Sequence, residues 1–254
     1  MDKSKKQQNQ KNSNSNEIKV EIVPEDYAQY DLSFKIIVIG DAGVGKSCLT
    51  LKAIKNYFTE GHNATVGFDF FTYCIKLNGT VIKLQVWDTC GQEIYKSLVF
   101  NFFRNSSLAL MVYSINSKES FDNINYWLKD IKNQSSPDVK IFLIGNKADL
   151  EQEREVPTND GEKLKEEQKF DLFMETSAKT GFNAEKVFIE AAKILYQDYL
   201  SYRERSSRTS SMLSIPLNYS RTGGNRAENV KLPKPKNDNK NNNTKTDDEV
   251  KCCK

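Results

Sequence analysis

The sequence contains a single histidine, His62, and its five cysteines follow neither the spacing of a zinc site nor that of a disulfide framework. These counts exclude a multi-histidine metal site and favour a reducing compartment. The sequence also lacks an apolar run as long as a membrane span, an N-terminal signal-peptide core and an internal repeat. We therefore expect a globular protein whose function needs neither a metal cluster nor a membrane-spanning helix.

Both ends of the chain contain few large apolar residues. Residues 1–16 are almost entirely Lys, Gln, Asn, Ser and Asp, and residues 201–254 are rich in Arg, Lys, Ser and Asn. Such segments bury too little apolar surface to offset the entropy lost on ordering. We expect a disordered polar leader at residues 1–30, one globular domain at residues 31–200 and a disordered basic tail at residues 201–254.

The net charge of +3 is unevenly distributed. Residues 201–254 contain 12 Lys or Arg and 6 Asp or Glu, so this tail is positive and the rest of the chain is slightly negative. A basic tail suits an anionic membrane surface or nucleic acid, or is simply a solvated end. We expect no nucleic-acid binding, because no folded basic face with interleaved aromatic residues is visible.

One stretch carries a phosphate-binding pattern, since Gly40 to Ser47 reads G-x-x-x-x-G-K-S. An apolar run of strand length, residues 34–39, precedes it, and a helix-compatible segment, residues 48–54, follows. Glycines let backbone N–H groups approach phosphate oxygens, and the helix N-terminus adds partial positive charge. Lys46 would reach the β- and γ-phosphates, and the Ser47 hydroxyl would ligate Mg²⁺. We expect nucleotide contacts from Asp41, Ala42, Gly43, Val44, Gly45, Lys46, Ser47 and Cys48.

The rest of the domain alternates strand and helix patterns. Asn78-Gly79 predicts a two-residue hairpin between strands at residues 68–77 and 81–87. We expect an α/β P-loop NTPase fold, a doubly wound, mostly parallel six-stranded sheet with one antiparallel edge hairpin and about five helices. Further strands are expected at residues 108–113, 139–144 and 171–174, and helices at residues 120–133, 159–168 and 183–200, with a short irregular helix ending near residue 103.

Chemically distinctive residues follow the predicted strands, so they should meet at one rim of the sheet. Asp88 ends an apolar strand, as expected of a carboxylate that holds Mg²⁺. Gly91 offers a backbone N–H to a γ-phosphate, and the Gln92 amide can orient an attacking water. We therefore expect Gln92, Lys46 and Gly91 to take part in catalysis.

Residues 146–149 match the pattern N-K-x-D after another buried strand. The Asp149 carboxylate can accept hydrogen bonds from N1–H and the exocyclic amine of guanine, a pair of donors that adenine lacks. A buried carboxylate left unpaired costs about 1–3 kcal/mol, so this residue selects guanine over adenine.

With these residues the chain resembles a Ras-superfamily small GTPase, and within that superfamily a Rab protein, over roughly residues 34–200. Five guanine-nucleotide motifs occur in order: the phosphate loop, Thr65, residues 88–92, residues 146–149 and residues 177–179. Rab-like signatures are residues 66–70, 83–87 and 113–116.

The resemblance implies roles for further residues. Thr65 would be the switch threonine, which ligates Mg²⁺ together with Ser47 and Asp88 only in the GTP state. Phe58 would pack edge-on against the base and Lys147 along its plane. Nucleotide contacts are thereby implied for Phe58, Thr65, Gly91, Asn146, Lys147, Asp149, Ser177, Ala178 and Lys179, with GTP or GDP as ligand and Mg²⁺ as cofactor.

The sequence ends with Cys252 and Cys253 followed by Lys254, which resembles the Rab signal for double geranylgeranylation. It is not a C-a-a-X box, and Asp2 excludes the N-myristoylation of Arf proteins. The resemblance implies a monomeric regulator of vesicle traffic on the cytosolic face of endomembranes, with a cytosolic pool. Its partners would be an exchange factor, a GTPase-activating protein, effectors, a prenylation escort and a GDP-dissociation inhibitor.

Three departures from the pattern keep two alternatives open. Ala42 stands where Ras has glycine, Cys90 stands where alanine is usual, and residues 102–107 replace the usual Tyr-Tyr-Arg-Gly-Ala. A hydrolysis-impaired GTP-binding membrane adaptor is one alternative, against which the presence of Gln92 speaks. Another P-loop NTPase, an ATPase or nucleotide kinase, is the other; Asp149 and the lack of a substrate lid oppose it.

Overall fold

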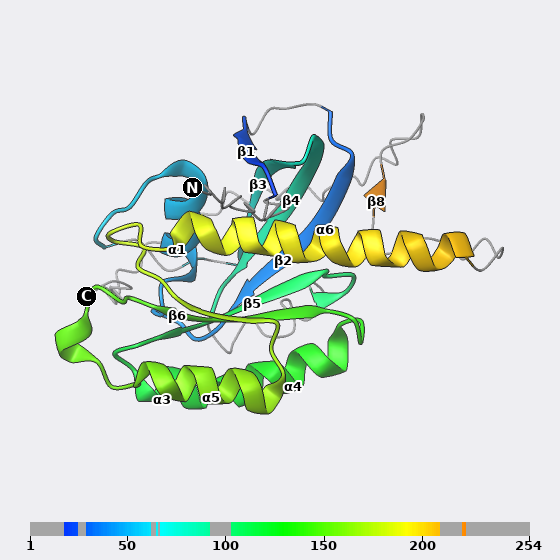
Figure 1. Ribbon diagram of the computed structural model, residues 1–254. Helices are drawn as coiled ribbons and strands as arrows, with labels where there is room; N and C mark the ends of the chain where they lie inside the picture. Colours follow the sequence, from blue (N-terminus) through cyan, green and yellow to red (C-terminus); the bar gives the residue numbers. More distant parts are fainter. Residues whose placement is uncertain are drawn as a thin grey trace, which may run out of the picture.

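The computed structural model describes residues 18–24, 29–61, 65, 67–91, 103–208 and 220–221. Within them the strands form one sheet in the order β1-β3-β4-β2-β5-β6-β7 (Figure 1). The pairs β2–β4, β2–β5, β5–β6 and β6–β7 are parallel, whereas β3 pairs with β1 and β4 in antiparallel fashion. The bounds are β1 (Val20–Val23), β2 (Leu32–Ile39), β3 (Phe68–Leu77), β4 (Thr80–Thr89), β5 (Leu108–Ser114), β6 (Lys140–Asn146) and β7 (Leu172–Glu175).

Helices cover both faces of this sheet (Figure 1). One face packs against α1 (Lys46–Lys55) and α6 (Ala184–Arg208), and the other against α3 (Lys118–Asp122), α4 (Ile124–Gln134) and α5 (Thr158–Gln168). Side chains of a strand alternate between faces. Central strand β2 accordingly sends Ile36 and Val38 into the first core and Ile37 and Ile39 into the second.

The predicted fold class is confirmed. The strands and helices alternate as expected, and the β3–β4 hairpin turns at the predicted dipeptide. Asn78 (φ 48°) and Gly79 (φ 89°) both adopt the left-handed conformation that a two-residue turn of this kind requires. The irregular helix expected before residue 103 lies outside the described residues.

Strand β1 corrects the expectation of a wholly disordered leader. It pairs with β3 over Val20↔Leu77 to Val23↔Cys74, while Ile18 and Val20 pack against the core. Glu21 also lies 3.6 Å from Lys76 across the strand pair. The prediction extended the polar character of the first sixteen residues to the whole leader and overlooked the alternation of apolar and charged residues at 18–22. This short segment forms a strand because the edge of β3 offers it hydrogen bonds.

The C-terminal side is also more ordered than expected. Helix α6 continues past residue 200 to Arg208, and a two-residue strand, β8 (Ser220–Arg221), pairs antiparallel with Leu32 and Ser33. Because β5 begins only opposite Ile36, the start of β2 has a free edge there for β8. None of the described helices is both long and apolar enough to cross a membrane.

The helix expected at residues 120–133 is divided in two. Helix α3 begins after Ser117, whose side chain accepts a hydrogen bond from the Ser120 N–H, and it ends at Asp122. Helix α4 then begins at Ile124. Asn123 stands at the break, and its side chain is used elsewhere, as shown below. Periodicity could not reveal the break, because the apolar positions keep their helical spacing across it.

If β1 contributes to the core, a charge placed at Val20 destabilises the domain more than the same charge at Ile22. Val20 packs against the core, whereas Ile22 is 42 % exposed. We expect Val20→Asp to lower the free energy of unfolding by about 1–3 kcal/mol more than Ile22→Asp. Chemical denaturation measures the difference, and equal effects would show that β1 does not pack against the domain.

Candidate functional site

The predicted phosphate loop connects β2 to α1 at the carboxyl end of the parallel strands. Gly40 has a φ of +139°, and a Cβ there would lie 2.1 Å from the Val112 carbonyl oxygen. Gly45 has a φ of +89°, and its Cβ would lie 2.6 Å from the Asn146 side chain. Both positions therefore require glycine, and the loop is held against the ends of β5 and β6.

Lys46, the first residue of α1, has a buried side chain directed back at the loop. Its ammonium group donates hydrogen bonds to the carbonyl oxygens of Gly40 at 3.0 Å and Asp41 at 2.8 Å. The charge is thereby placed inside the curve of the loop. Phosphates bound there would meet this ammonium together with the helix N-terminus.

The three residues predicted to hold Mg²⁺ come together. The hydroxyls of Ser47 and Thr65 lie 2.7 Å apart. Asp88 is fully buried next to them, and neither carboxylate oxygen has a hydrogen-bond partner of good geometry among the described residues. A buried carboxylate without a partner of this kind, beside two hydroxyls, fits a hard cation that takes oxygen ligands and completes its shell with phosphates.

The pKa of Asp88 is raised to about 6, mainly by burial and to a smaller extent by the nearby charge of Asp69. The Ser47 hydroxyl and the Lys46 charge act in the opposite direction but do not cancel the effect of burial. The carboxylate is therefore destabilised until a cation joins it.

The segment that follows β4 rests on the phosphate loop. A Cβ on Gly91 would lie 2.4 Å from the Ala42 nitrogen and from the Asp41 carbonyl carbon, so only glycine allows this approach. The Thr89 hydroxyl anchors the end of β4 by donating to the Val38 carbonyl oxygen at 2.7 Å. The predicted catalytic residue Gln92 lies outside the described residues.

Asn146 joins the loop to two other motifs. Its amide nitrogen donates to the carbonyl oxygens of Val44 at 2.9 Å and Gly45 at 3.3 Å, and its amide oxygen accepts from the Thr176 hydroxyl at 3.1 Å. The predicted nucleotide contact of Asn146 stays a prediction, and the structure adds that its side chain bridges the loop to Thr176. Thr176 was not predicted, although it directly precedes the S-A-K motif.

A cavity of about 300 Å³ lies beside the loop and is lined by residues from four segments. Asp149 lines this cavity, and its carboxylate accepts a hydrogen bond of 2.5 Å from the Ser177 hydroxyl. Two other lining residues, Lys179 and Glu60, form an ion pair of 3.0 Å, and Glu60 was not predicted from the sequence. The cavity lining is Gly45, Cys48, Phe58, Glu60, Asn146, Lys147, Asp149, Leu150, Ala178 and Lys179.

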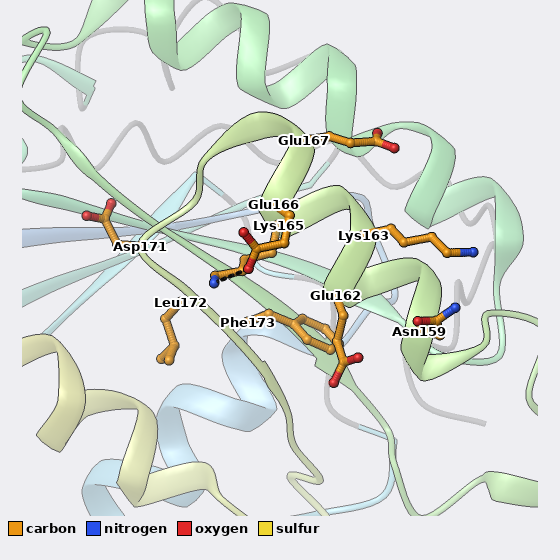
Figure 2. A pocket seen from close by; sticks show the side chains of 9 residues that line it. All are labelled: Asn159, Glu162, Lys163, Lys165, Glu166, Glu167, Asp171, Leu172 and Phe173. Carbon is orange, nitrogen blue, oxygen red and sulfur yellow. Dashed lines mark hydrogen bonds and ion pairs between the residues drawn. The ribbon is translucent and has the colours of Figure 1, made fainter.

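A second, open groove of about 650 Å³ runs along α5 and β7 (Figure 2). Figure 2 shows its charged side chains, including Glu162, Lys163 and Glu167, pointing in different directions and not toward a common centre. The Asp171 carboxylate accepts a hydrogen bond from the Ile141 N–H of β6 at 2.8 Å, so it is already used in binding the sheet backbone. The groove contains none of the predicted site residues.

The structure thus gathers the predicted residues that it describes at one rim of the sheet. The phosphate loop from Asp41 to Cys48, then Thr65, Asp88 and Gly91, face the phosphate side. Phe58, Asn146, Lys147, Asp149, Ala178 and Lys179 line the cavity, and Ser177 is hydrogen-bonded to Asp149. Cys252 and Cys253 lie outside the described residues.

A family model described as the Ras family matches residues 35–197. The chain belongs to the Ras family. The match covers every described residue of the rim, from the phosphate loop to Lys179, and Ras-family proteins are small GTPases that bind GTP and GDP. The loop, the cluster of Ser47, Thr65 and Asp88, and the cavity therefore form the candidate nucleotide site of this Ras-family domain.

The raised pKa of Asp88 predicts a pH-dependent effect on the protein without nucleotide and metal. The folded state holds this proton more tightly than the unfolded chain, so its stability falls as pH rises from about 4 to about 6. Asp88→Asn should therefore stabilise the metal-free protein at pH 7 by about 1–3 kcal/mol. Denaturation in EDTA measures this gain, which should shrink as pH falls to 4.

The same substitution should weaken binding of Mg²⁺ with nucleotide, because it removes the one carboxylate of the cluster. A metal-free Asp88→Asn protein that is no more stable than the native one at pH 7 would contradict the description of Asp88 as a carboxylate destabilised by burial.

Proposed function

We propose that this Ras-family protein is a Rab-like molecular switch. It binds GTP or GDP with Mg²⁺, hydrolyses GTP slowly, and regulates vesicle traffic from a membrane surface. The observation that carries the nucleotide part is the bridge made by Asn146, which fixes the phosphate loop and the base cavity in one frame. The Rab-type role is supported by the sequence signatures and by the paired cysteines at residues 252 and 253.

The phosphates would be held by backbone N–H groups of the loop, by the N-terminus of α1 and by Lys46. In the structure Lys46 donates to two loop carbonyls, and it would exchange these for phosphate oxygens. The magnesium ion neutralises phosphate charge when bound. Ser47 and Asp88 would hold it in both nucleotide states, and Thr65 in the GTP state, in which phosphates complete the oxygen shell.

Guanine would be recognised in the cavity that Asp149 lines. The Ser177 hydroxyl donates to one carboxylate oxygen and orients the group, leaving the other oxygen for the donors of the base. Phe58 and the stem of Lys147 would enclose the ring, and the Ala178 N–H would contact its carbonyl oxygen. The Lys179–Glu60 ion pair would then lie beside the ribose edge of the base.

Hydrolysis would depend on the segment that begins at Gly91. Its N–H would bind the γ-phosphate, and Gln92 would orient the water in line with the leaving oxygen. A neutral amide suits this role because it positions water without competing as a base. An activating protein would add an arginine, which in such enzymes accelerates hydrolysis by about 10³–10⁵.

The γ-phosphate would order the chain around Thr65 and after Gly91, and hydrolysis would release it. Next to these segments, Phe68 and Phe70 are 39 % and 48 % exposed and contact the Trp87 ring at about 5 Å between centroids. Exposed aromatic clusters mark interaction surfaces. We place the effectors here, where a partner would sense both the aromatic surface and the state of the switch.

The tail would carry the membrane anchor. Two prenyl chains on Cys252 and Cys253 would hold the protein stably where one chain is marginal, and the basic tail adds attraction to anionic lipid. A prenylation escort and a GDP-dissociation inhibitor would serve these chains, and the exchange factor and activating protein would serve the nucleotide. Their combined action gives a membrane-bound population and a cytosolic pool of monomers.

Two alternatives differ from this proposal in the chemistry of turnover. A hydrolysis-impaired GTP-binding adaptor would bind GTP but not cleave it, because Ala42 and Cys90 replace the usual residues. The backbone nitrogen of Ala42 adjoins Gly91 in the structure. In this alternative, the Ala42 methyl group would crowd an arginine brought to the γ-phosphate. An ATPase or nucleotide kinase finds no support in the family match, and Asp149 would meet the donors of guanine, which adenine lacks.

The role of Gln92 is tested by Gln92→Leu in single-turnover hydrolysis of bound GTP. Leucine has a similar volume but cannot orient water, so we expect intrinsic hydrolysis to fall by about tenfold or more, with GTP affinity unchanged. Stimulation by an activating protein should be lost as well. Unchanged rates in both assays would remove Gln92 from the mechanism, and a native protein without any hydrolysis would favour the adaptor.

The anchor is tested by replacing Cys252 and Cys253 with serine, singly and together, in cells. Because two chains bind stably and one binds weakly, the single variants should be partly soluble and the double variant fully so. Fractionation measures the distribution, and GTP binding of the purified variants controls for folding. A double variant that stays on membranes would show that these cysteines are not the anchor.

A further inference from the structure

The side chain of Asp41, the second residue of the phosphate loop, is bound by the α3–α4 region. One carboxylate oxygen accepts a hydrogen bond from the Asn123 amide at 2.7 Å, and the other accepts one from the Trp127 indole N–H at 2.8 Å. Both distances are short for N–H···O bonds, as expected when the acceptor is charged. The backbone of Asp41 is therefore part of the phosphate loop, whereas its carboxylate is hydrogen-bonded to the α3–α4 region.

The two donors are held rigidly. Trp127 is 3 % exposed and lies in the second core with Ile124 and Ile131. Asn123 stands at the break between α3 and α4, one helical turn before Trp127, and its side chain leaves the helix surface to reach Asp41. The division between α3 and α4 and the hydrogen bond to Asp41 therefore fall on the same residue.

The backbone of Asp41 contacts two residues assigned to the reaction. Its carbonyl oxygen accepts the hydrogen bond from Lys46 at 2.8 Å. Its carbonyl carbon and oxygen would also lie 2.4 Å and 2.6 Å from a Cβ on Gly91, so the chain after β4 lies directly against it. A shift of Asp41 would consequently move the partner of Lys46 and the surface that supports Gly91.

We propose that Asp41 is a positioning residue that fixes the phosphate loop to helix α4 and, through its backbone, sets Lys46 and Gly91. The proposal rests on the nucleotide function proposed above. Two charge-assisted bonds keep a negative carboxylate turned away from the phosphates, which it would otherwise repel. They also order the loop before nucleotide binds, so binding does not have to bear that entropic cost.

Two variants each remove one part of this clamp with little change in volume. Asp41→Asn exchanges one carboxylate oxygen for an amide group that cannot accept from its donor, and Trp127→Phe removes the indole N–H. Asp122→Asn is the matched control, because it makes the same change at an exposed carboxylate that pairs with Lys118 on the surface. The double variant Asp41→Asn/Trp127→Phe tests whether the two residues act through one contact.

Release of bound GDP with Mg²⁺ is the functional measurement. We expect release to be about tenfold faster in each single variant, which corresponds to the loss of one hydrogen bond to a charged group. The double variant should be no faster than about the faster single one. Asp122→Asn should release GDP at the native rate.

Two NMR signals separate positioning from simple stabilisation. The chain has two tryptophans, so its indole N–H region is simple, and Trp127→Phe assigns the Trp127 signal. Asp41→Asn should shift that signal in both the nucleotide-free and the GDP-bound protein. The ³¹P signal of the GDP β-phosphate should move in Asp41→Asn and in Trp127→Phe, but not in Asp122→Asn.

An unshifted indole signal in Asp41→Asn would overturn the clamp. A shifted indole signal with native GDP release and native ³¹P signal would overturn the positioning role and leave only a structural contact. Failure of the proposed function has a different signature, since the native protein would then bind no guanine nucleotide, whatever its indole spectrum, and the role of Asp41 toward Lys46 would fall with it.

Discussion

The amide of Asn146 is the interaction on which the nucleotide site depends. It satisfies two loop carbonyls and the Thr176 hydroxyl at once, so the end of β6, the phosphate loop and the segment after β7 share one buried polar junction. A buried polar group that loses its partner costs about 1–3 kcal/mol, and here three groups would lose theirs together. Such a junction would hold the bound phosphates and base at a fixed distance from each other, because the phosphate loop and the cavity are both attached to the ends of the sheet strands.

The two faces of the sheet contribute differently to this site. On the first face, α1 carries Lys46 and Ser47 out of the core that it shares with α6. On the second face, Trp127 of α4 and Asn123, the residue before α4, donate hydrogen bonds to the Asp41 carboxylate of the loop. Between them lies Asp88, buried and raised in pKa. The domain therefore combines well-packed apolar layers with a rim where charge is buried at a cost, and a cation and phosphates bound as proposed would relieve that cost.

Much of this arrangement could be predicted from the sequence because it follows from local patterns. The apolar run before Gly40 indicated a buried strand, and the dipeptide Asn78-Gly79 indicated a two-residue hairpin turn. The rim followed from parallel topology, since motifs placed after parallel strands meet at one edge. The family resemblance then supplied roles, such as that of Thr65, that spacing alone does not contain.

What escaped prediction depends on contacts between distant segments. Strand β1 forms because its backbone pairs with the edge of β3, and the sequence of the leader does not indicate that this edge is available. Asn123 stands at the division of a helix of regular apolar spacing, and its side chain binds Asp41, more than eighty residues earlier. Thr176 and Glu60 belong to the site through Asn146 and Lys179, and their sequence neighbours give no sign of either partner.

The most direct test of the account is equilibrium competition between GTP and ATP for the purified full-length protein with Mg²⁺. The position of Asp149 at the cavity predicts that GTP and GDP bind at least about tenfold more tightly than ATP and ADP, because adenine lacks the N1–H and exocyclic amine that guanine would donate to the carboxylate. Equal affinities, or a preference for ATP, would contradict the assignment of the cavity to guanine and with it the central claim that this rim is a guanine-nucleotide switch.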